Sequence, residues 1–200
     1  EIYTLSLHDA LPISSWPITS PTQDMILGAY YLTYPGTAQK TQTVNGKEKT
    51  IYAMDEFTDR KIVAANKAAG LKRIAEKGDG KVFTDVDEML MAYQNGVVGI
   101  HARVKVRMYA GEDDAKGRLV ESTVGRFIYN QGLPQDLGYV NRKRDPYSLE
   151  VDFLCGKKKL GEIINRCFSV HANTGTVIML DYIKSMGQLE IGRASCRERV

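Results

Sequence analysis

The chain has no long hydrophobic run. Its 200 residues include no apolar stretch of the roughly 20 residues that a membrane-spanning helix needs, so no membrane contact is expected. The N-terminus also lacks a basic stretch followed by an apolar core, which predicts that no secretory signal is present. Both absences favour a cytoplasmic location.

Cysteine is scarce as well. The three cysteines, Cys155, Cys167 and Cys196, form no Cys-x-x-Cys pair. This spacing argues against a disulfide framework and against a zinc site in this chain. We expect reduced thiols in packed positions.

A large excess of either charge is also lacking. The net charge of +3 does not by itself indicate a nucleic-acid partner. Hydrophobic residues make up 43% of the chain, as in ordinary globular proteins, and the length suits one domain or two small ones.

The two ends of the chain can be encoded by one DNA string read on opposite strands. The run 190–200 can be written in codons whose reverse complement encodes residues 3–13. The string resembles a short-read sequencing adapter, and a chance match over that length is rare. We therefore interpret residues 1–14 and 190–200 as translated adapter that packs poorly on residues 15–189. The alternative is a real amphipathic tail at each end.

The N-terminal part of the remaining chain predicts a helix and a hairpin. Ser20 is a suitable N-cap, Gln23 completes a capping box, and the apolar run 25–32 predicts a helix buried nearly all round. Asn45-Gly46 suits a tight hairpin turn. Residues 58–77 predict a basic surface helix that ends at Gly78.

The following part predicts a helix from Asp85 to Asn95 and then a strand. Apolar and basic side chains alternate along residues 100–108, with Arg103, Lys105 and Arg107 on the basic face.

Further helices are expected at 123–130, 160–170 and 176–186, the last two joined at 173–175. Helices with a small antiparallel sheet indicate an α+β fold.

Four blocks of sequence stand out by their motifs. They are Pro17–Thr33 with Pro-Ile-x-x-Pro-x-Gln-Asp, Gly80–Met108 with His-Ala-Arg-Val-Lys-Val-Arg, Thr123–Gly138 with Thr-Val-Gly-Arg, and Leu180–Gly187. In order and rough spacing these blocks resemble the largest subunit, β′, of bacterial DNA-directed RNA polymerases. Four ordered blocks across residues 17–187 are far more specific than one short motif.

The resemblance implies that the chain is an incomplete internal fragment of a larger multidomain subunit. In the family, this segment lines the pore through which nucleotides enter, just before the funnel helices. The implied activity is DNA-templated RNA synthesis from nucleoside triphosphates by the assembled nucleotidyltransferase. The implied partners are the β, α, ω and σ subunits, the DNA template and the RNA, in the cytoplasm at the nucleoid.

The resemblance implies Mg²⁺ and Zn²⁺ in the whole enzyme, but neither ligand set is in this sequence. The family's Asn-Ala-Asp-Phe-Asp-Gly-Asp magnesium motif and its zinc cysteines are absent. No catalytic residue and no metal ligand are therefore assigned, and the fragment alone is expected to be inactive. The acidic run 85–88 is interpreted as helix-cap charge.

Two segments receive their own interpretation. Residues 36–78 depart from the family, whose linker there is usually shorter, and are expected to be a surface insertion. Residues 159–187 are expected to form a helical hairpin that leads towards the funnel.

Six residues are candidates for a site. The resemblance suggests that Gln23 and Asp24 face the RNA 3′ end or the incoming nucleotide, unless Gln23 only closes its capping box. The other candidates are basic and are expected to contact nucleic-acid phosphates: Arg103, Lys105, Arg107 and Arg126. Alternatively, the strand face is solvated and paired with acids, and Arg126 forms a salt bridge. A rival function is a stand-alone nucleic-acid-binding module without enzymatic activity.

Overall fold

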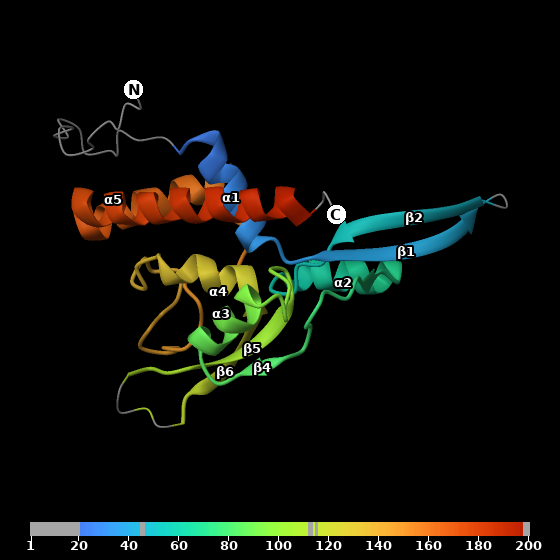
Figure 1. Ribbon diagram of the computed structural model, residues 1–200, viewed down its shortest axis with the longest axis horizontal. Coiled ribbons are helices and arrows are strands. Elements are labelled where there is room, and N and C mark those ends of the chain that lie inside the picture. The colour runs from blue at the N-terminus through green and yellow to red at the C-terminus, as the bar shows by residue number, and fades with distance from the viewer. Residues whose placement is uncertain (1–20, 45–46, 112–113, 115, 198–200) are drawn as a thin grey trace.

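The structure is a computed structural model that describes residues 21–44, 47–111, 114 and 116–197 (Figure 1). Within these ranges the chain forms five helices and six strands, arranged in two three-stranded sheets of order β2-β1-β3 and β4-β5-β6. The α+β class is therefore confirmed. No helix among the described residues combines the length and apolar character that crossing a membrane requires.

The first helix, α1 (Gln23–Thr33), begins later than expected. Its N-cap is Thr22, whose hydroxyl accepts a hydrogen bond from the Met25 backbone N–H at 3.4 Å. The prediction of Ser20 as N-cap is wrong, and Ser20 itself lies outside the described residues. Gln23 is therefore the first helical residue and cannot close a capping box.

Helix α1 is also less buried than its apolar sequence predicts. Leu27 is 55% and Tyr30 40% exposed, whereas Ala29 and Leu32 are fully buried. The buried face packs on the last helix. There a Cβ placed on Gly28 would lie 2.4 Å from the Gly187 Cα, so the two backbones approach as closely as glycine allows.

The segment after α1 forms a projecting unit, which we call the arm (residues 37–73). It consists of β1 (Thr37–Val44), β2 (Lys47–Met54), α2 (Arg60–Ala69) and β3 (Lys72–Arg73), and Figure 1 shows the hairpin extending away from the rest.

The arm keeps the expected hairpin but not the expected length of its helix. Val44 pairs with Lys47, and positions 45–46, where the turn is predicted, lie outside the described residues. Helix α2 ends at Gly70, which adopts a left-handed conformation (φ 67°), and not at Gly78. The chain then adds β3 to the sheet by pairing with β1.

The second sheet contributes to the hydrophobic core. It contains β4 (Val82–Phe83), β5 (Arg103–Met108) and β6 (Arg118–Thr123), and β4 pairs with β5 in parallel, so this sheet is mixed and not purely antiparallel as predicted. Helices α3 (Val86–Gln94) and α4 (Val124–Gln131) pack against it. Both helices begin where predicted, and both are capped: the Asp85 carboxylate accepts from the Glu88 N–H, and the Thr123 hydroxyl accepts from the Arg126 N–H.

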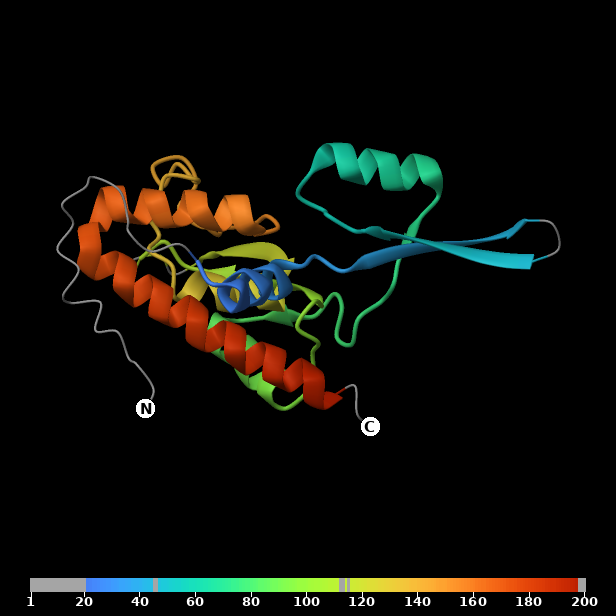
Figure 2. The ribbon, with the colours of Figure 1, turned by 90° about the horizontal axis from the view of Figure 1, so that it is seen from above.

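The chain ends in α5 (Lys157–Arg197), which is two helical segments joined at one non-helical residue. Ala172 has φ 53° and ψ −151°, and Figure 2 shows the chain reversing there, so that the segments diverge from one corner. The predicted three-residue joint at 173–175 is therefore wrong, since these residues are already helical.

The interpretation of the two ends as adapter stays a prediction. Residues 1–14 lie outside the described residues, and at the other end the structure describes a helical backbone as far as Arg197.

Candidate functional site

The start of α1 presents Gln23 and Asp24 to solvent. Both side chains are exposed, and neither has a hydrogen-bond or ion-pair partner among the described residues. The backbone beneath them is held by the Thr22 cap and by the Gly28–Gly187 contact with α5. This arrangement offers one amide and one carboxylate on a rigid support, which suits the binding of a polar ligand.

Arg126, by contrast, is the centre of a buried ionic network. Its guanidinium is fully buried and donates to Glu56 at 2.6 Å, to Asp152 at 3.2 Å and to the Thr33 carbonyl at 3.0 Å. The Phe57 ring lies 5.1 Å from the guanidinium carbon. The phosphate contact expected at Arg126 is therefore corrected: Arg126 forms the salt bridge that the sequence left open as the alternative, and it has no surface for a phosphate.

A second ionic cluster joins the arm to the core sheet. Asp55, at the end of β2, pairs with Arg103 at 2.8 Å and with Arg73 at 3.3 Å. Burial opposes ionisation of Asp79, but hydrogen bonds from Arg73 and from the backbone N–H groups of Glu76 and Arg103 outweigh it and hold the pKa of Asp79 below its usual value. The Asp79 carboxylate therefore stays ionised near neutral pH.

The basic face of β5 exists as predicted, because Val104 and Val106 are fully buried while the alternate residues point the other way. Most of its charge is used within the protein, however. Arg103 is paired with Asp55, and Arg107 donates to the Lys116 carbonyl at 2.5 Å. Lys105 lies 3.6 Å from Glu121 and its side chain is 48% exposed. Lys105 is thus the most accessible of the three for an external phosphate.

His101 does not belong to this basic face. Its ring packs edge-on against Tyr31 and Tyr34, with centroids 4.8 and 5.4 Å apart. Burial lowers the pKa of His101 to about 4, opposed by a hydrogen bond with the Tyr34 backbone. The imidazole is therefore neutral at pH 7.

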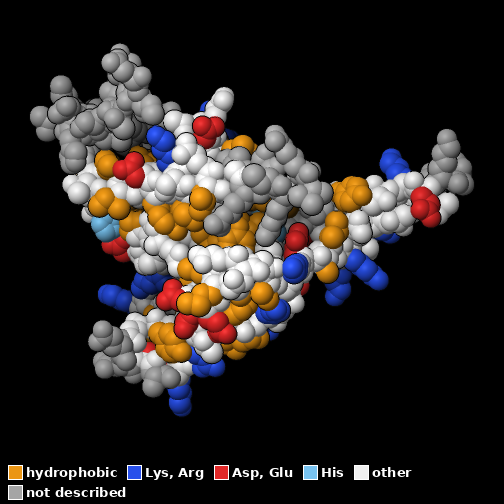
Figure 3. Space-filling model, viewed as in Figure 1, with side chains coloured by type: hydrophobic (Ala, Val, Ile, Leu, Met, Phe, Trp, Pro, Cys, Tyr) orange, Lys and Arg blue, Asp and Glu red, His pale blue; other side chains and the backbone are white. Residues whose placement is uncertain are grey.

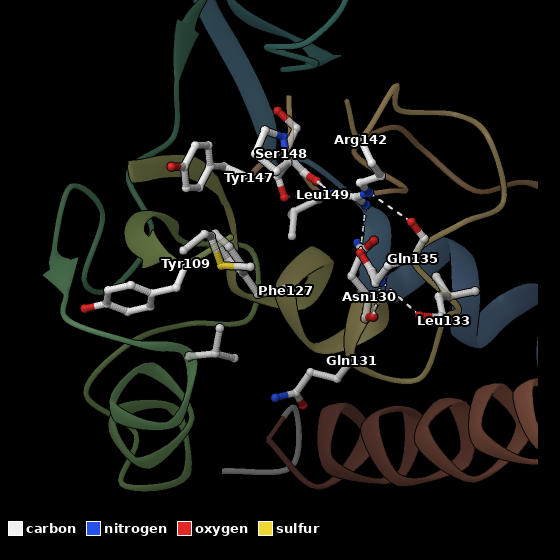
Figure 4. Close-up of a pocket in the computed structure, with 13 residues that line it drawn as sticks. Tyr109, Phe127, Asn130, Gln131, Leu133, Gln135, Arg142, Tyr147, Ser148 and Leu149 are labelled. Carbon is white, nitrogen blue, oxygen red and sulfur yellow. Dashed lines mark hydrogen bonds between the residues drawn. The ribbon is translucent and has the colours of Figure 1, made fainter. Parts of the chain in front are cut away.

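A cavity of about 340 Å³ lies between α4 and the irregular segment 132–149 (Figure 4). Asn130, Gln135 and Arg142 gather on one side of it, and Phe127 and other apolar groups lie opposite. The Arg142 guanidinium is occupied: it donates to the Gln135 and Ser148 carbonyls and to the Glu150 carboxylate. These polar groups hold the irregular segment in place, and none is left free for catalysis.

No metal centre is found in the described part of the chain, where no group of three or more His, Cys, Asp or Glu side chains converges. The acidic run 85–88 behaves as helix-cap charge: Asp85 caps α3, and Glu88 accepts from the Thr84 backbone N–H and hydroxyl, each at 2.7 Å. The residues present therefore do not fit the magnesium or the zinc that the resemblance implies for the whole enzyme.

Several residues of the ionic networks carry no recognisable signal in the sequence. Asp55 and Glu56 follow strand β2 of the arm, and their partners Arg103 and Arg126 are 48 and 70 positions away. The two arginines lie in motifs, Arg103 in His-Ala-Arg-Val-Lys-Val-Arg and Arg126 in Thr-Val-Gly-Arg, but no motif marks the two acids.

Comparison with known proteins gives one consistent result. Residues 10–195 match the family model described as RNA polymerase Rpb1, domain 3. The chain is 49% identical over 176 residues (88% of the chain) to the DNA-directed RNA polymerase subunit beta' of Alkaliphilus oremlandii, and 44% identical over 184 residues (92%) to that of Clostridioides difficile. It spans only 12% and 13% of the length of these two curated relatives. The chain therefore belongs to the RNA polymerase Rpb1 domain 3 family, as a segment homologous to part of the bacterial β′ subunit.

Proposed function

We propose that this chain scaffolds the nucleotide-entry pore of a bacterial DNA-directed RNA polymerase. The assembled enzyme would synthesise RNA from nucleoside triphosphates on a DNA template, with the β, α, ω and σ subunits as partners at the nucleoid. Family membership supports the setting. Mg²⁺ and Zn²⁺ would be held by other parts of the subunit, since the described residues supply no ligand cluster.

The observation that carries the pore assignment is the start of α1. Gln23 and Asp24 stand exposed on a backbone that the Thr22 cap and the Gly28–Gly187 contact fix in place. The capping-box role of Gln23 is removed by the helix start, so its amide is available to a ligand. We propose that these two side chains face the incoming nucleotide or the RNA 3′ end.

The rival function, a stand-alone nucleic-acid-binding module, has weaker support. It depends on a set of basic residues in which Arg126 is fully buried and Arg103 is paired with Asp55. Lys105 alone offers few phosphate contacts.

The test is the elongation rate of a polymerase reconstituted with Gln23→Ala or Asp24→Ala in its full-length β′ subunit. Loss of one hydrogen bond worth about 1 kcal/mol would slow nucleotide addition roughly fivefold. Gln94→Ala and Asp87→Ala are matched controls, because these residues are of the same types and lie on α3, away from α1. Wild-type rates in both α1 variants would refute the assignment.

A further inference from the structure

The arm separates its charges between two sides. Its acids Asp55 and Glu56 point to the core, where Asp55 pairs with Arg103 and Glu56 with Arg126. Asp55 also pairs with Arg73, at the end of the arm itself. Because Asp55 and Glu56 are already engaged in these ion pairs, they cannot neutralise the lysine and arginine side chains farther out on the arm.

The bases of the arm remain on its outer surface. Among the arm side chains that the structure describes, two acids are exposed, Glu48 and Asp59, and Asp59 is engaged as the N-cap of α2. The exposed bases are Lys49, Arg60, Lys61, Lys67 and Lys72. None of these five forms an ion pair with another described residue. Figure 3 shows Lys and Arg side chains gathered along the arm at the right of the view.

Helix α2 concentrates these bases on one face. Ile62 and Asn66, one turn apart, lie toward the hairpin, where the Asn66 amide donates to the Met54 carbonyl at 2.9 Å. The opposite face carries Arg60, Lys61 and Lys67 around Ala64 and Ala68. Small residues between the bases allow an extended anionic surface to approach closely.

Helix α2 is held by its caps and by a few hydrogen bonds to the hairpin, and it has little tertiary packing. None of its ten residues is buried. Helices of this length are marginal in water without tertiary packing. A partner of opposite charge laid along the outer face would supply the missing contact.

The same side of the arm carries Lys49 but no exposed aromatic ring. Lys49 shares the hairpin face of Lys40, whose ammonium reaches the Ala69 carbonyl of α2 at 2.8 Å. Tyr52, 64% exposed, pairs with Gln39 and lies on the other face. Single-stranded nucleic acid binds largely through stacking of its nucleobases on aromatic side chains, and this face has none. Lysine and arginine side chains alone therefore suit a duplex, whose nucleobases are paired and whose phosphates are exposed.

We propose that the outer face of α2, extended by Lys49, binds the phosphate backbone of duplex DNA without sequence preference. This inference is independent of the pore assignment, because it uses none of the residues at the start of α1.

The test uses the full 200-residue chain and a fluorescent duplex of random sequence, with binding measured by anisotropy over a range of salt concentrations. The variant Arg60→Gln/Lys61→Gln/Lys67→Gln should bind at least about tenfold more weakly at low salt. The slope of log affinity against log salt should also become shallower, by about 0.9 for each phosphate that the protein no longer neutralises.

The matched control is Lys143→Gln/Arg144→Gln/Lys158→Gln, which removes the same charge from exposed positions outside the arm. A second variant, Ala64→Glu, keeps every base and places an acid in the centre of the face, and it should weaken binding as well. Circular dichroism should show unchanged melting in all three variants.

Three outcomes of the binding measurements would overturn the proposal, and one outcome of a competition experiment would do so as well. The first three are an unchanged salt slope in the arm variant, an equal loss of affinity in the control, or a loss of affinity confined to a single strand of the same sequence. Competition by polyglutamate that exceeds competition by unlabelled duplex would assign the face to an acidic protein and would equally refute it.

Discussion

At the scale of single residues, the buried pair of Arg126 and Glu56 should dominate stability. Arg126→Met leaves the Glu56 carboxylate buried without its partner and the Thr33 carbonyl without its donor. We expect the free energy of unfolding to fall by about 3–5 kcal/mol, measured by urea denaturation.

The control for this prediction is an exposed ion pair. Lys159 and Glu162 are about half exposed, so Glu162→Gln should change the free energy of unfolding by about 0–1 kcal/mol. Equal, small effects in both variants would show that the Arg126 network is not formed.

His101 predicts how stability depends on pH. Its pKa is about 4 in the folded chain and 6.5 in the unfolded chain, so the unfolded state binds the proton more readily. The free energy of unfolding should therefore keep the full contribution of the neutral imidazole above pH 6.5. It should fall by about 3 kcal/mol as the pH drops from 6.5 to 4.

The variant His101→Phe keeps an aromatic ring beside Tyr31 and Tyr34 and should lose stability much less steeply over this range. Hydrogen bonds from Arg118 and Ser148 lower the pKa of Asp145 to about 2. Protonation of Asp145 should therefore reduce stability only between pH 3.8 and 2, below the range in which His101 titrates. A wild-type stability that is flat from pH 6.5 to 4 would contradict the buried, neutral imidazole.

At the scale of elements, we expect two Gly→Ala substitutions to change stability in opposite directions, because only one of them lies where α1 and α5 meet. A Cβ at position 28 would lie 2.4 Å from the Gly187 Cα, so Gly28→Ala should force α1 and α5 apart and lower the melting temperature. Gly161→Ala, in α5 with nothing within 4 Å of its Cβ, should raise stability by about 0.5–1 kcal/mol. An unchanged or higher melting temperature in Gly28→Ala would mean that the two helices do not pack as described.

The sequence predicts the start of a helix well where a side chain close in sequence caps it. Asp85 and Thr123 are identifiable as caps, because each supplies an oxygen to a backbone N–H three residues on. The alternation along β5 likewise predicts which side chains are buried. At the start of α1, the capping-box position of Gln23 favours Ser20 as the cap, but the helix begins after Thr22.

Distant partners are not predictable from the sequence. The end of α2 at Gly70 accompanies pairing of β3 with β1, and the roles of Arg103 and Arg126 depend on acids 48 and 70 residues away. For this reason only the structure distinguishes the candidate residues that a ligand can reach from those that it cannot. Gln23 and Asp24 are accessible, Lys105 is partly accessible, and Arg126 is buried.

At the scale of the whole molecule, the chain should have no polymerase activity alone. Phosphoryl transfer of this kind needs clustered metal ligands, and the described residues contain none. We expect no template-dependent RNA synthesis by the purified chain in a radiolabelled nucleotide assay with Mg²⁺. Detectable synthesis that survives removal of contaminating polymerase would contradict the proposed division of labour with the rest of the subunit.

We propose above all that the start of α1 faces the path of the incoming nucleotide. The most direct test of this proposal is crosslinking in a reconstituted polymerase that carries Gln23→Cys in its β′ subunit, with a nucleoside triphosphate bearing a thiol-reactive group. Cys155 and Cys167 are buried and should contribute little background. We expect labelling at position 23 that excess unmodified nucleotide suppresses, and little labelling of a Gln94→Cys control. Labelling at position 23 no greater than in the control would contradict the proposal.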